Sequence, residues 1–325
     1  MDDALYRGPI VDAHIHLWDL SMRRHPWLDP SDPHPLGDLG PIRRDYLPPD
    51  YRADAAGQNV VAAVHVEAGW DPATPLGEMR WLDSLDKLDG VPNRYVAAVA
   101  LEAAGAEAAV AAQAGYDRVV GVRAGLSWHA DPAKRFAARA DLMQDARWLA
   151  GVRAVGRHGL HLEAMIYPGQ ADEFARVAAA CPDQIFIVNH CASPVDQDAA
   201  GIERWRAALR RLAAEPNVML KISNVGAYVS TPTRAEVREV ALRCIDAFGA
   251  ARSMFASDYP PARLHTSFGE IFEAFRHAVQ SFAPAEQAAL FHDNAARCYR
   301  IGGSAEARLK GRRATAKPAG IEFED

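Results

Sequence analysis

Three histidines and one aspartate are the residues of this 325-residue chain whose types and positions could do chemistry. His14 and His16 stand two residues apart in VDAHIH, so on an extended strand they point to the same side. Two imidazoles at that spacing can share one metal ion or one substrate. His190 follows the apolar run IFIVN, and Asp258 follows SMFAS. A carboxylate just past a buried run is costly unless it is paired, metal-bound or functional.

Eight short apolar runs alternate with Ala/Leu/Arg-rich stretches along the chain. The predicted strands span residues 9–14, 60–66, 95–101, 118–122, 160–166, 185–189, 218–222 and 253–256. Apolar residues at three- and four-residue spacing predict helices at 141–157, 171–180, 203–214, 233–248, 267–281 and 284–299. Strands that alternate with helices pair in parallel, and eight such units predict an α/β fold, the closed (β/α)₈ or TIM barrel. The competing open sheet lacks its G-x-G-x-x-G phosphate fingerprint here.

A barrel of this kind carries its chemistry at the carboxyl ends of its strands. His14 and His16 end the first predicted strand, His190 the sixth and Asp258 the eighth. Each residue has an ordinary alternative, such as a half-exposed histidine near a loop or a hydrogen-bonded histidine in the core. Because all four meet at one end of the barrel, together they predict a single active site.

We expect one distorted barrel domain over residues 1–303. The proline-rich stretch 19–57 after the first strand is too long for a plain loop, and we interpret it as an insertion over the barrel mouth. The polar stretch 304–325 is expected to be a tail outside the core.

Composition excludes several functional classes. The net charge of −6 offers no basic excess for a nucleic-acid backbone. The chain has no run of about 18 apolar residues, so no membrane span is predicted. Four cysteines without a C-x-x-C pair, and an amino terminus without an apolar leader, favour a cytoplasmic protein. The expected partner is a small molecule, and pairing with a second copy of the chain stays open.

The ordered motifs resemble the amidohydrolase superfamily, in particular the amidohydrolase-related branch that includes sugar-acid lactonases and 2-pyrone-4,6-dicarboxylate lactonase. The resemblance covers about residues 8–302. Its matching motifs are VDAHIHLWD, VHVEA, GVRAG, VNHCASP, LKIS, ASDYP and HDNAARCYRI. This set is specific for the branch and much less specific for the substrate.

The resemblance implies roles for the four residues. His14 and His16 match the family's first-strand pair, His190 its sixth-strand histidine, and Asp258 the eighth-strand aspartate that acts as general base on the attacking water. Two departures argue against a binuclear centre: we find no bridging lysine on the fourth strand, and Lys221 stands where many relatives carry a further histidine. What remains is one divalent metal, with Zn²⁺ as the first candidate, held by these four residues, or no metal.

Five further residues are candidates for binding the substrate. Arg123 is a planar cation suited to a carboxylate or a developing oxyanion, and Lys221 offers a second positive charge. His65 and Glu67 alternate on the second predicted strand and can face the mouth together. Trp18 could form a wall of the pocket. The alternatives are surface ion pairs for Arg123 and Lys221, a salt bridge under the insertion for Glu67, and packing for Trp18.

The resulting hypothesis is a hydrolase that opens a sugar-acid or dicarboxylate lactone. In a metal-bound version Zn²⁺ polarises the carbonyl or acidifies a water, and in a metal-free version the histidines and Arg123 stabilise the oxyanion. Asp258 takes the water proton in both. One alternative is a metal-dependent decarboxylase of an aromatic or muconate-type acid, and another is a barrel that binds a ligand without catalysis.

Overall fold

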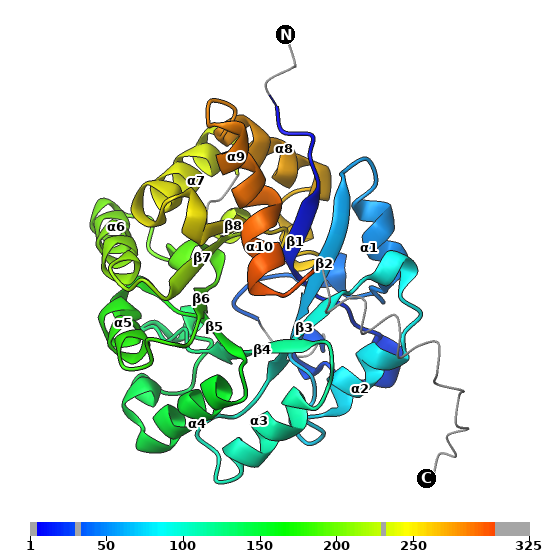
Figure 1. Cartoon of the computed structure of the whole chain (residues 1–325), viewed down its shortest axis with the longest axis vertical. Coiled ribbons are helices and arrows are strands. Elements are labelled where there is room, and N and C mark those ends of the chain that lie inside the picture. Colours follow the sequence, from blue (N-terminus) through cyan, green and yellow to red (C-terminus); the bar gives the residue numbers. More distant parts are fainter. Residues whose placement is uncertain (1–4, 30–33, 229–231, 303–325) are drawn as a thin grey trace.

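Eight parallel strands form a barrel in the computed structural model of the chain, which describes residues 5–29, 34–228 and 232–302. Each strand pairs with the next one in the sequence, as the alternation of strands and helices requires (Figure 1). The predicted (β/α)₈ architecture is thereby confirmed. The strands are β1 (Ile10–Ile15), β2 (Val60–Val66), β3 (Arg94–Ala98), β4 (Val119–Gly125), β5 (His161–Met165), β6 (Phe186–Val188), β7 (Val218–Ile222) and β8 (Ser253–Phe255).

A ring of helices surrounds the strands (Figure 1). The α-helices are α1 (Pro48–Asp54), α2 (Gly77–Ser84), α3 (Ala106–Ala114), α4 (Ala146–Arg157), α5 (Ala171–Ala179), α6 (Ala199–Ala213), α7 (Arg234–Phe248), α8 (Phe268–Ala278), α9 (Pro284–Ala288) and α10 (Asn294–Cys298). The helix predicted at 284–299 is interrupted by a π-helical turn, Ala289–Asp293. Helix α1 begins with two prolines inside the predicted insertion, where the absence of their N–H groups costs no helical bond.

The barrel is closed between its first and last strands by a few specific bonds. Ile15 pairs with Tyr259, the amide of His16 donates to the carbonyl of Tyr259 at 2.8 Å, and the amide of Asp258 donates to the carbonyl of His14 at 2.9 Å. The closing bonds therefore run through the same backbone that carries the candidate catalytic residues.

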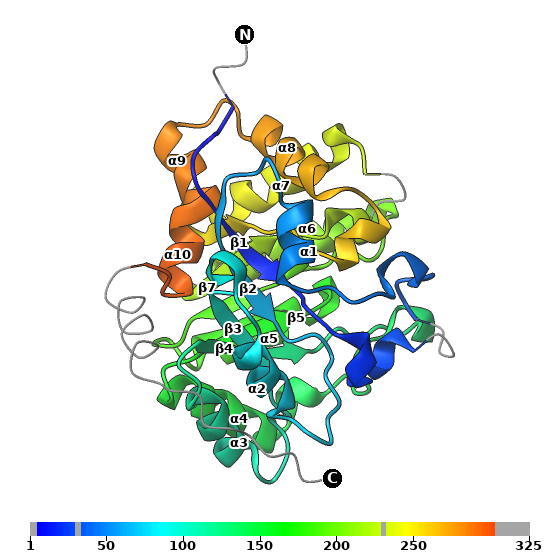
Figure 2. The same ribbon diagram turned by 90° about the vertical axis from the view of Figure 1, so that its right-hand side faces the viewer.

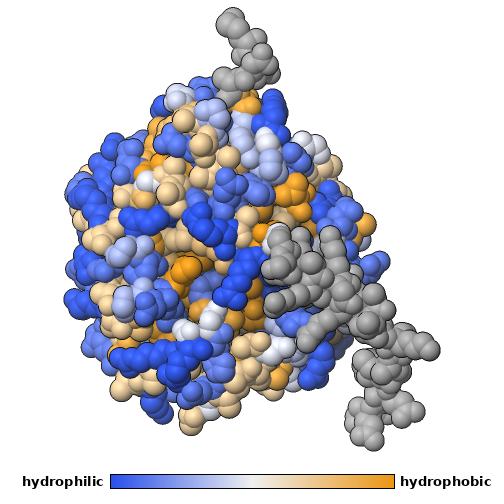
Figure 3. Space-filling model, in the orientation of Figure 1, coloured by the Kyte–Doolittle hydropathy of each residue, from blue (hydrophilic) through white to orange (hydrophobic). Residues whose placement is uncertain are grey.

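The barrel has two differently covered ends. Helix α10 lies across the end that faces the viewer in Figure 1, and its Ala295 and Cys298, together with the adjoining Tyr299, pack into a core cluster with residues from seven strands. Figure 2 shows the segment between β1 and α1 at the opposite end. Over the α10 face, hydrophilic and apolar side chains intermingle (Figure 3). The open end for chemistry is thus the one beneath the β1–α1 segment.

The predicted tail at 304–325 lies outside the described residues. Within the described part of the chain, the helices are all too short or too polar to cross a membrane.

Candidate active site

Four predicted residues meet at the ends of β1, β6 and β8. The Nε2 atoms of His14 and His16 lie 3.2 Å apart, and each lies 3.3 Å from Oδ1 of Asp258. Nε2 of His190 lies 4.0 Å from the same oxygen. All four side chains are buried. Residues 14, 190 and 258 are far apart in the sequence, so only the closed barrel brings them to one point.

This donor set fits a divalent metal. Ligands about 2.1 Å from a tetrahedral ion lie about 3.4 Å from one another, close to the spacing of His14, His16 and Asp258, whose donor atoms all lie within 4.8 Å of each other. Nδ1 of His16 lies 2.8 Å from the carbonyl oxygen of Val66. A carbonyl only accepts, so Nδ1 carries the proton and Nε2 presents its lone pair to the cluster.

The other two histidines are held by different partners. Nδ1 of His190 lies 2.9 Å from the hydroxyl of Ser223, which can accept from it. Nδ1 of His14 instead faces the ammonium group of Lys221 at 3.4 Å. The orientation of His14 is therefore set by a cation on β7, whereas His16 has the acceptor that commonly supports a metal-binding imidazole.

Burial sets the charge state of the cluster. Desolvation lowers the pKa of His16 to about 3 and that of His190 to about 4, and it also lowers the pKa of His14. The three imidazoles are therefore neutral at neutral pH. His16 presents a free Nε2 lone pair to the cluster, whereas Nδ1 of His14 accepts from Lys221, so Nε2 of His14 carries its proton. Desolvation raises the pKa of Asp258, and the positive charge of Arg123 opposes this rise. A raised pKa makes this carboxylate a stronger base than an exposed aspartate.

The backbone at the site is unusually strained. All four residues from His190 to Ser193 have positive φ angles, between 48° and 59°, and Asp258 has φ of 58°. Residues other than glycine rarely adopt this region, and when they do the strain concentrates at functional sites. The turn ends β6 abruptly after Val188 and redirects the chain at His190, which the alternating pattern of a strand does not predict.

A cavity of about 500 Å³ opens above the cluster. His16, His190 and Asp258 line it, as do Glu67 and Arg123. Nε of Arg123 donates to Oε1 of Glu67 at 2.6 Å, and both side chains are 14% exposed. Of the predicted substrate-binding residues, these two reach the cavity and form an ion pair with each other there.

Loops supply the rest of the cavity wall. The segment between β1 and α1 contributes Trp27, His34, Pro35 and Leu36. The loop after β4 contributes Ala133, Lys134 and Phe136. The predicted covering role of the 19–57 stretch therefore rests on its part before α1. Tyr228 also lines the cavity, and its hydroxyl donates to Oγ of Ser193 at 3.0 Å.

His65 and Trp18 do not line this cavity. His65 is fully buried, accepts from the amide of Leu17 at 3.2 Å and has its Nε2 3.1 Å from Oε1 of Glu78. Trp18 is also fully buried and donates from its indole nitrogen to the carbonyl of Arg44 at 2.7 Å. Both residues are therefore packed among protein groups and do not reach the cavity.

Lys221 does not line the cavity either. Its Nζ lies 2.6 Å from Oε2 of Glu163 and both side chains are fully buried. Glu163 also accepts from the Tyr299 hydroxyl at 2.7 Å and from the Asn189 side chain at 2.9 Å. Burial alone would raise the pKa of Glu163, but the charge of Lys221 outweighs it and holds that pKa well below its usual range.

Our sequence reasoning missed Glu163, although its signal was present. A glutamate inside the apolar strand LHLEAMI needs a buried cation, and Lys221 in VMLKI is a cation inside another strand. Read together, these two residues indicate a pair within the barrel. The pair explains why Lys221 turns toward β5 and not toward the cavity.

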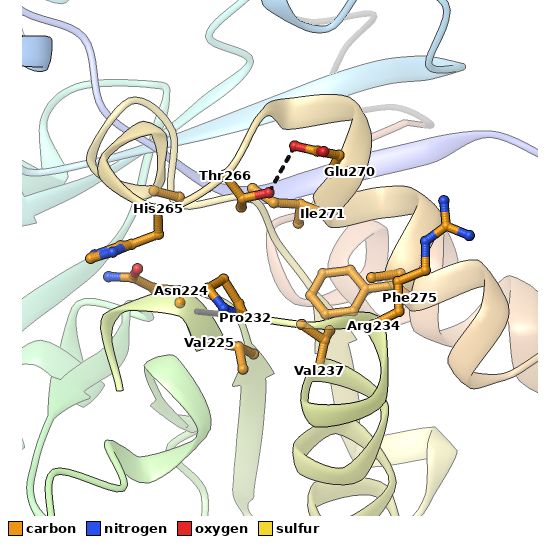
Figure 4. A pocket seen from close by; sticks show the side chains of 13 residues that line it. Asn224, Val225, Pro232, Arg234, Val237, His265, Thr266, Glu270, Ile271 and Phe275 are labelled. Carbon is orange, nitrogen blue, oxygen red and sulfur yellow. Dashed lines mark hydrogen bonds between the residues drawn. The ribbon is translucent and has the colours of Figure 1, made fainter. Parts of the chain in front are cut away.

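Asn224 was also missed. It lines both the main cavity and a smaller one of about 130 Å³ between the loop after β7 and helix α8. Figure 4 shows Asn224 beside His265 at one end of the smaller cavity, with Val237 and Phe275 among its apolar lining. Neither His14, His16, His190 nor Asp258 lines this second cavity, so we assign the chemistry to the larger one.

The fold and this cluster define an amidohydrolase. A sequence model described as amidohydrolase matches residues 11–301, so the chain belongs to that family and is a hydrolase. An uncharacterized protein of Sinorhizobium fredii, y4mH, is 36% identical over 293 residues, which cover 90% of this chain and 98% of that protein. An L-fucono-1,5-lactonase of Burkholderia multivorans is 30% identical over 320 residues, covering 92% of this chain and 98% of that enzyme.

A solved structure shares the fold. An amidohydrolase from Burkholderia multivorans with bound zinc superposes with a TM-score of 0.76 at 24% identity, over 91% of this chain and 100% of that chain.

Proposed function

We propose that this protein is a lactonase that opens a neutral, hydroxylated lactone, with Asp258 as the base that activates water. The observation that carries the proposal is the buried carboxylate of Asp258, which lies on the floor of a ligand-sized cavity within 3.3 Å of two imidazoles. The name of the Burkholderia multivorans relative, an L-fucono-1,5-lactonase, supports a sugar-type lactone.

The residues of this chain divide the reaction between them. His16 and His190, with Oδ1 of Asp258, would hold a divalent ion, Zn²⁺ first among the candidates, and His14 would join them with release of its Nε2 proton. Such an ion would supply a Lewis acid that polarises the carbonyl and acidifies water. The histidine contacts engage Oδ1, which leaves Oδ2 of Asp258 to take the water proton. The water oxygen bonds to the carbonyl carbon, the ring C–O bond breaks, and Asp258 returns the proton to the departing alkoxide, which yields a hydroxy acid.

The charges in the cavity favour a neutral substrate. Arg123 is paired with Glu67, and Nζ of Lys134 lies 2.7 Å from Oδ1 of Asp196. A dicarboxylate needs cations that are not already neutralised, whereas a carboxylate–guanidinium pair presents both acceptors and donors to hydroxyl groups. We therefore favour a hydroxylated lactone over a pyrone dicarboxylate.

The cysteines bear on the cellular compartment. The four cysteines are free thiols, and three of them are buried. This suits a reducing compartment, so we propose a cytoplasmic enzyme.

The test combines metal content with a substrate panel. The purified protein is assayed for zinc and for turnover of aldono-1,5-lactones, 2-pyrone-4,6-dicarboxylate and hydroxylated benzoic acids, before and after chelation. We expect about one metal per chain, release of acid from neutral lactones, and loss of turnover with the metal. Faster turnover of the dicarboxylate would contradict the charge argument, and release of CO₂ from the benzoic acids would favour the decarboxylase. Failure on every compound would revive the ligand-binding barrel.

A further inference from the structure

An aromatic wall stands over the catalytic cluster. The ring centroids of Trp27 and His34 are 5.3 Å apart, and those of His34 and Phe136 are 5.8 Å apart. All three side chains line the cavity that also contains Asp258. The wall therefore joins the segment between β1 and α1 to the loop after β4 across the same cavity.

The wall is held in place before any ligand arrives. The indole nitrogen of Trp27 donates to the carbonyl of Ala68 at 2.6 Å. The amide of Phe136 donates to the carbonyl of Ser127 at 3.0 Å. The loop that carries Phe136 is further tied by Tyr167, whose hydroxyl donates to the carbonyl of Lys134 at 2.7 Å. A preformed surface binds a ring without an added cost of ordering.

One member of the wall is open to solvent. Phe136 is 40% exposed, and within the described residues it is the aromatic member of the exposed large apolar side chains. A phenyl ring that faces a ligand-sized cavity gains by covering its face with another ring. His34 adds a polar group, because its Nδ1 accepts from the amide of Leu36 at 3.2 Å and a neutral ring then carries its proton on Nε2.

The cavity is larger than a single lactone ring needs. A space of roughly 150 Å³ accommodates one six-membered ring of the size of benzene, and this cavity measures about 500 Å³. Its polar catalytic groups come from strand ends, whereas Trp27, His34 and Phe136 come from loops beyond them. The volume therefore allows a second ring between the reacting lactone and the aromatic wall.

We propose that Trp27, His34 and Phe136 form a second subsite, which binds a flat-faced ring attached to the lactone. The preferred substrate is then a lactone that carries a glycosyl or aryl group, and the aromatic faces stack on that group. This inference rests on the proposed lactonase function and narrows its substrate.

The test compares ring-bearing lactones with their parent. The probes are the aldono-1,5-lactone with the highest kcat/KM in the panel, its glycosyl derivative and its benzyl ether. We expect the ratio of kcat/KM, ring-bearing over parent, to be about ten in the wild type and to fall roughly five-fold in Phe136→Ala. Ile185→Ala, at a side chain that is 41% exposed and does not line the cavity, serves as the control and should keep the ratio.

The outcomes distinguish a glycosyl from an aryl group and decide whether the subsite exists. A preference for the glycosyl derivative alone assigns a sugar to the wall, and one for the benzyl ether alone assigns an aryl group. A wild-type ratio below two for both derivatives, or an unchanged ratio in Phe136→Ala, overturns the subsite. If Phe136→Ala does not fold, Phe136→Leu removes the ring face while keeping an apolar side chain.

Binding tests the subsite even without turnover. The ring-opened acids of the three probes are titrated against the protein, with tryptophan fluorescence as the readout because Trp27 belongs to the wall. We expect the ring-bearing acids to bind about ten-fold more tightly than the parent acid, and Phe136→Ala to reduce that advantage. Selective binding without any lactone hydrolysis would reject the lactonase and keep the subsite. Equal binding of all three acids would reject the subsite.

Discussion

At the scale of single residues, the arrangement of side chains around Asp258 sets what the site can do. Its carboxylate is desolvated, and the neighbouring imidazoles are neutral because burial lowers their pKa values. A base and a set of potential metal ligands thus coexist without a strong ion pair that would quench either. Proton transfer and metal binding each depend on particular side-chain atoms. Single substitutions can therefore change activity while the fold is kept.

Asp258→Asn tests the base. Asparagine has nearly the same shape but cannot take a proton, so we expect kcat to fall by roughly 10² to 10⁴ while the fold is kept. Steady-state kinetics and the thermal midpoint check this. Asp172→Asn, whose carboxylate is 75% exposed on α5, is the matched control. Retention of more than about a tenth of wild-type kcat would remove Asp258 as the base.

Lys221→Met tests the buried pair with Glu163. Removing the cation leaves a carboxylate uncompensated in the barrel, so we expect a loss of about 3–5 kcal/mol in the free energy of unfolding. Lys221→Met combined with Glu163→Gln should lose less than the single change, because no buried charge is left alone. Urea unfolding measures both, with Glu107→Gln in an exposed pair as the control. If the double variant were less stable than the single one, the charge argument would fail.

At the scale of elements, loops from different βα units meet above the site and are fastened to one another. Asp196, just before α6, lies 2.7 Å from Nζ of Lys134 and 3.0 Å from Nη2 of Arg204. It also lies 3.4 Å from Nε2 of His129. Through these contacts Asp196 ties the loop after β4, which carries Lys134 and Phe136, to Arg204 on helix α6. The cavity wall is therefore a product of loop-to-loop contacts and not of any one element.

Asp196→Asn tests this fastening through its pH dependence. The hydrogen bond from Lys134 is the main cause that lowers the pKa of Asp196 to about 2, from an ordinary 3.8. The stabilisation is therefore fully present above about pH 4 and is lost as the pH falls toward 2. Because the group is partly exposed, we expect no more than about 1 kcal/mol at pH 7.

Urea unfolding of the wild type and Asp196→Asn at pH 7, 5 and 3 measures this difference. The gap between the two proteins should be constant from pH 7 to 5 and smaller at pH 3. A gap that grows toward acid would mean that Asp196 does not gain its stabilisation as a carboxylate.

At the scale of the whole molecule, one buried carboxylate, that of Asp12, helps to close the barrel next to the candidate site. The carboxylate of Asp12 accepts from the amide and hydroxyl of Ser257 at 2.8 and 2.6 Å, and from the hydroxyl of Tyr51 at 3.0 Å. These bonds join β1 to the end of β8 and to α1. His14 and Asp258 flank them, so closing the barrel also sets the distance between the imidazole and the carboxylate.

Asp12→Ala should therefore damage both stability and activity. Four donors, the amides of His14 and Ser257 and the hydroxyls of Ser257 and Tyr51, lose their acceptor, so we expect a loss of about 2–4 kcal/mol in the free energy of unfolding. The gap between His14 and Asp258 is no longer held, so kcat should fall although Asp12 does not line the cavity. Tyr51→Phe removes one of these bonds and serves as the milder comparison. Normal kcat in a folded Asp12→Ala protein would separate closure from catalysis. Light scattering of the purified protein tests whether two copies of the chain pair.

The sequence by itself determined the class of fold and the four residues that meet in the candidate site. Period-two apolar runs and period-three-to-four stretches are local signals, and strands followed by helices allow little other than parallel pairing. His14, His16, His190 and Asp258 were predictable because each follows such a run. Helix α1 was hidden by its prolines, and Ala-rich α3 has little contrast between its faces.

Only the tertiary structure decided how the remaining polar residues are used. Lys221 and Arg123 look alike in the sequence, as single cations in or beside apolar strand runs. In the structure Lys221 pairs with Glu163 inside the barrel, whereas Arg123 reaches the cavity beside Glu67. His65 and Trp18 turn to partners behind the site. The reason is physical: a strand's pattern states which face a side chain takes, but its partner comes from another strand or loop, and burial then makes that partner obligatory.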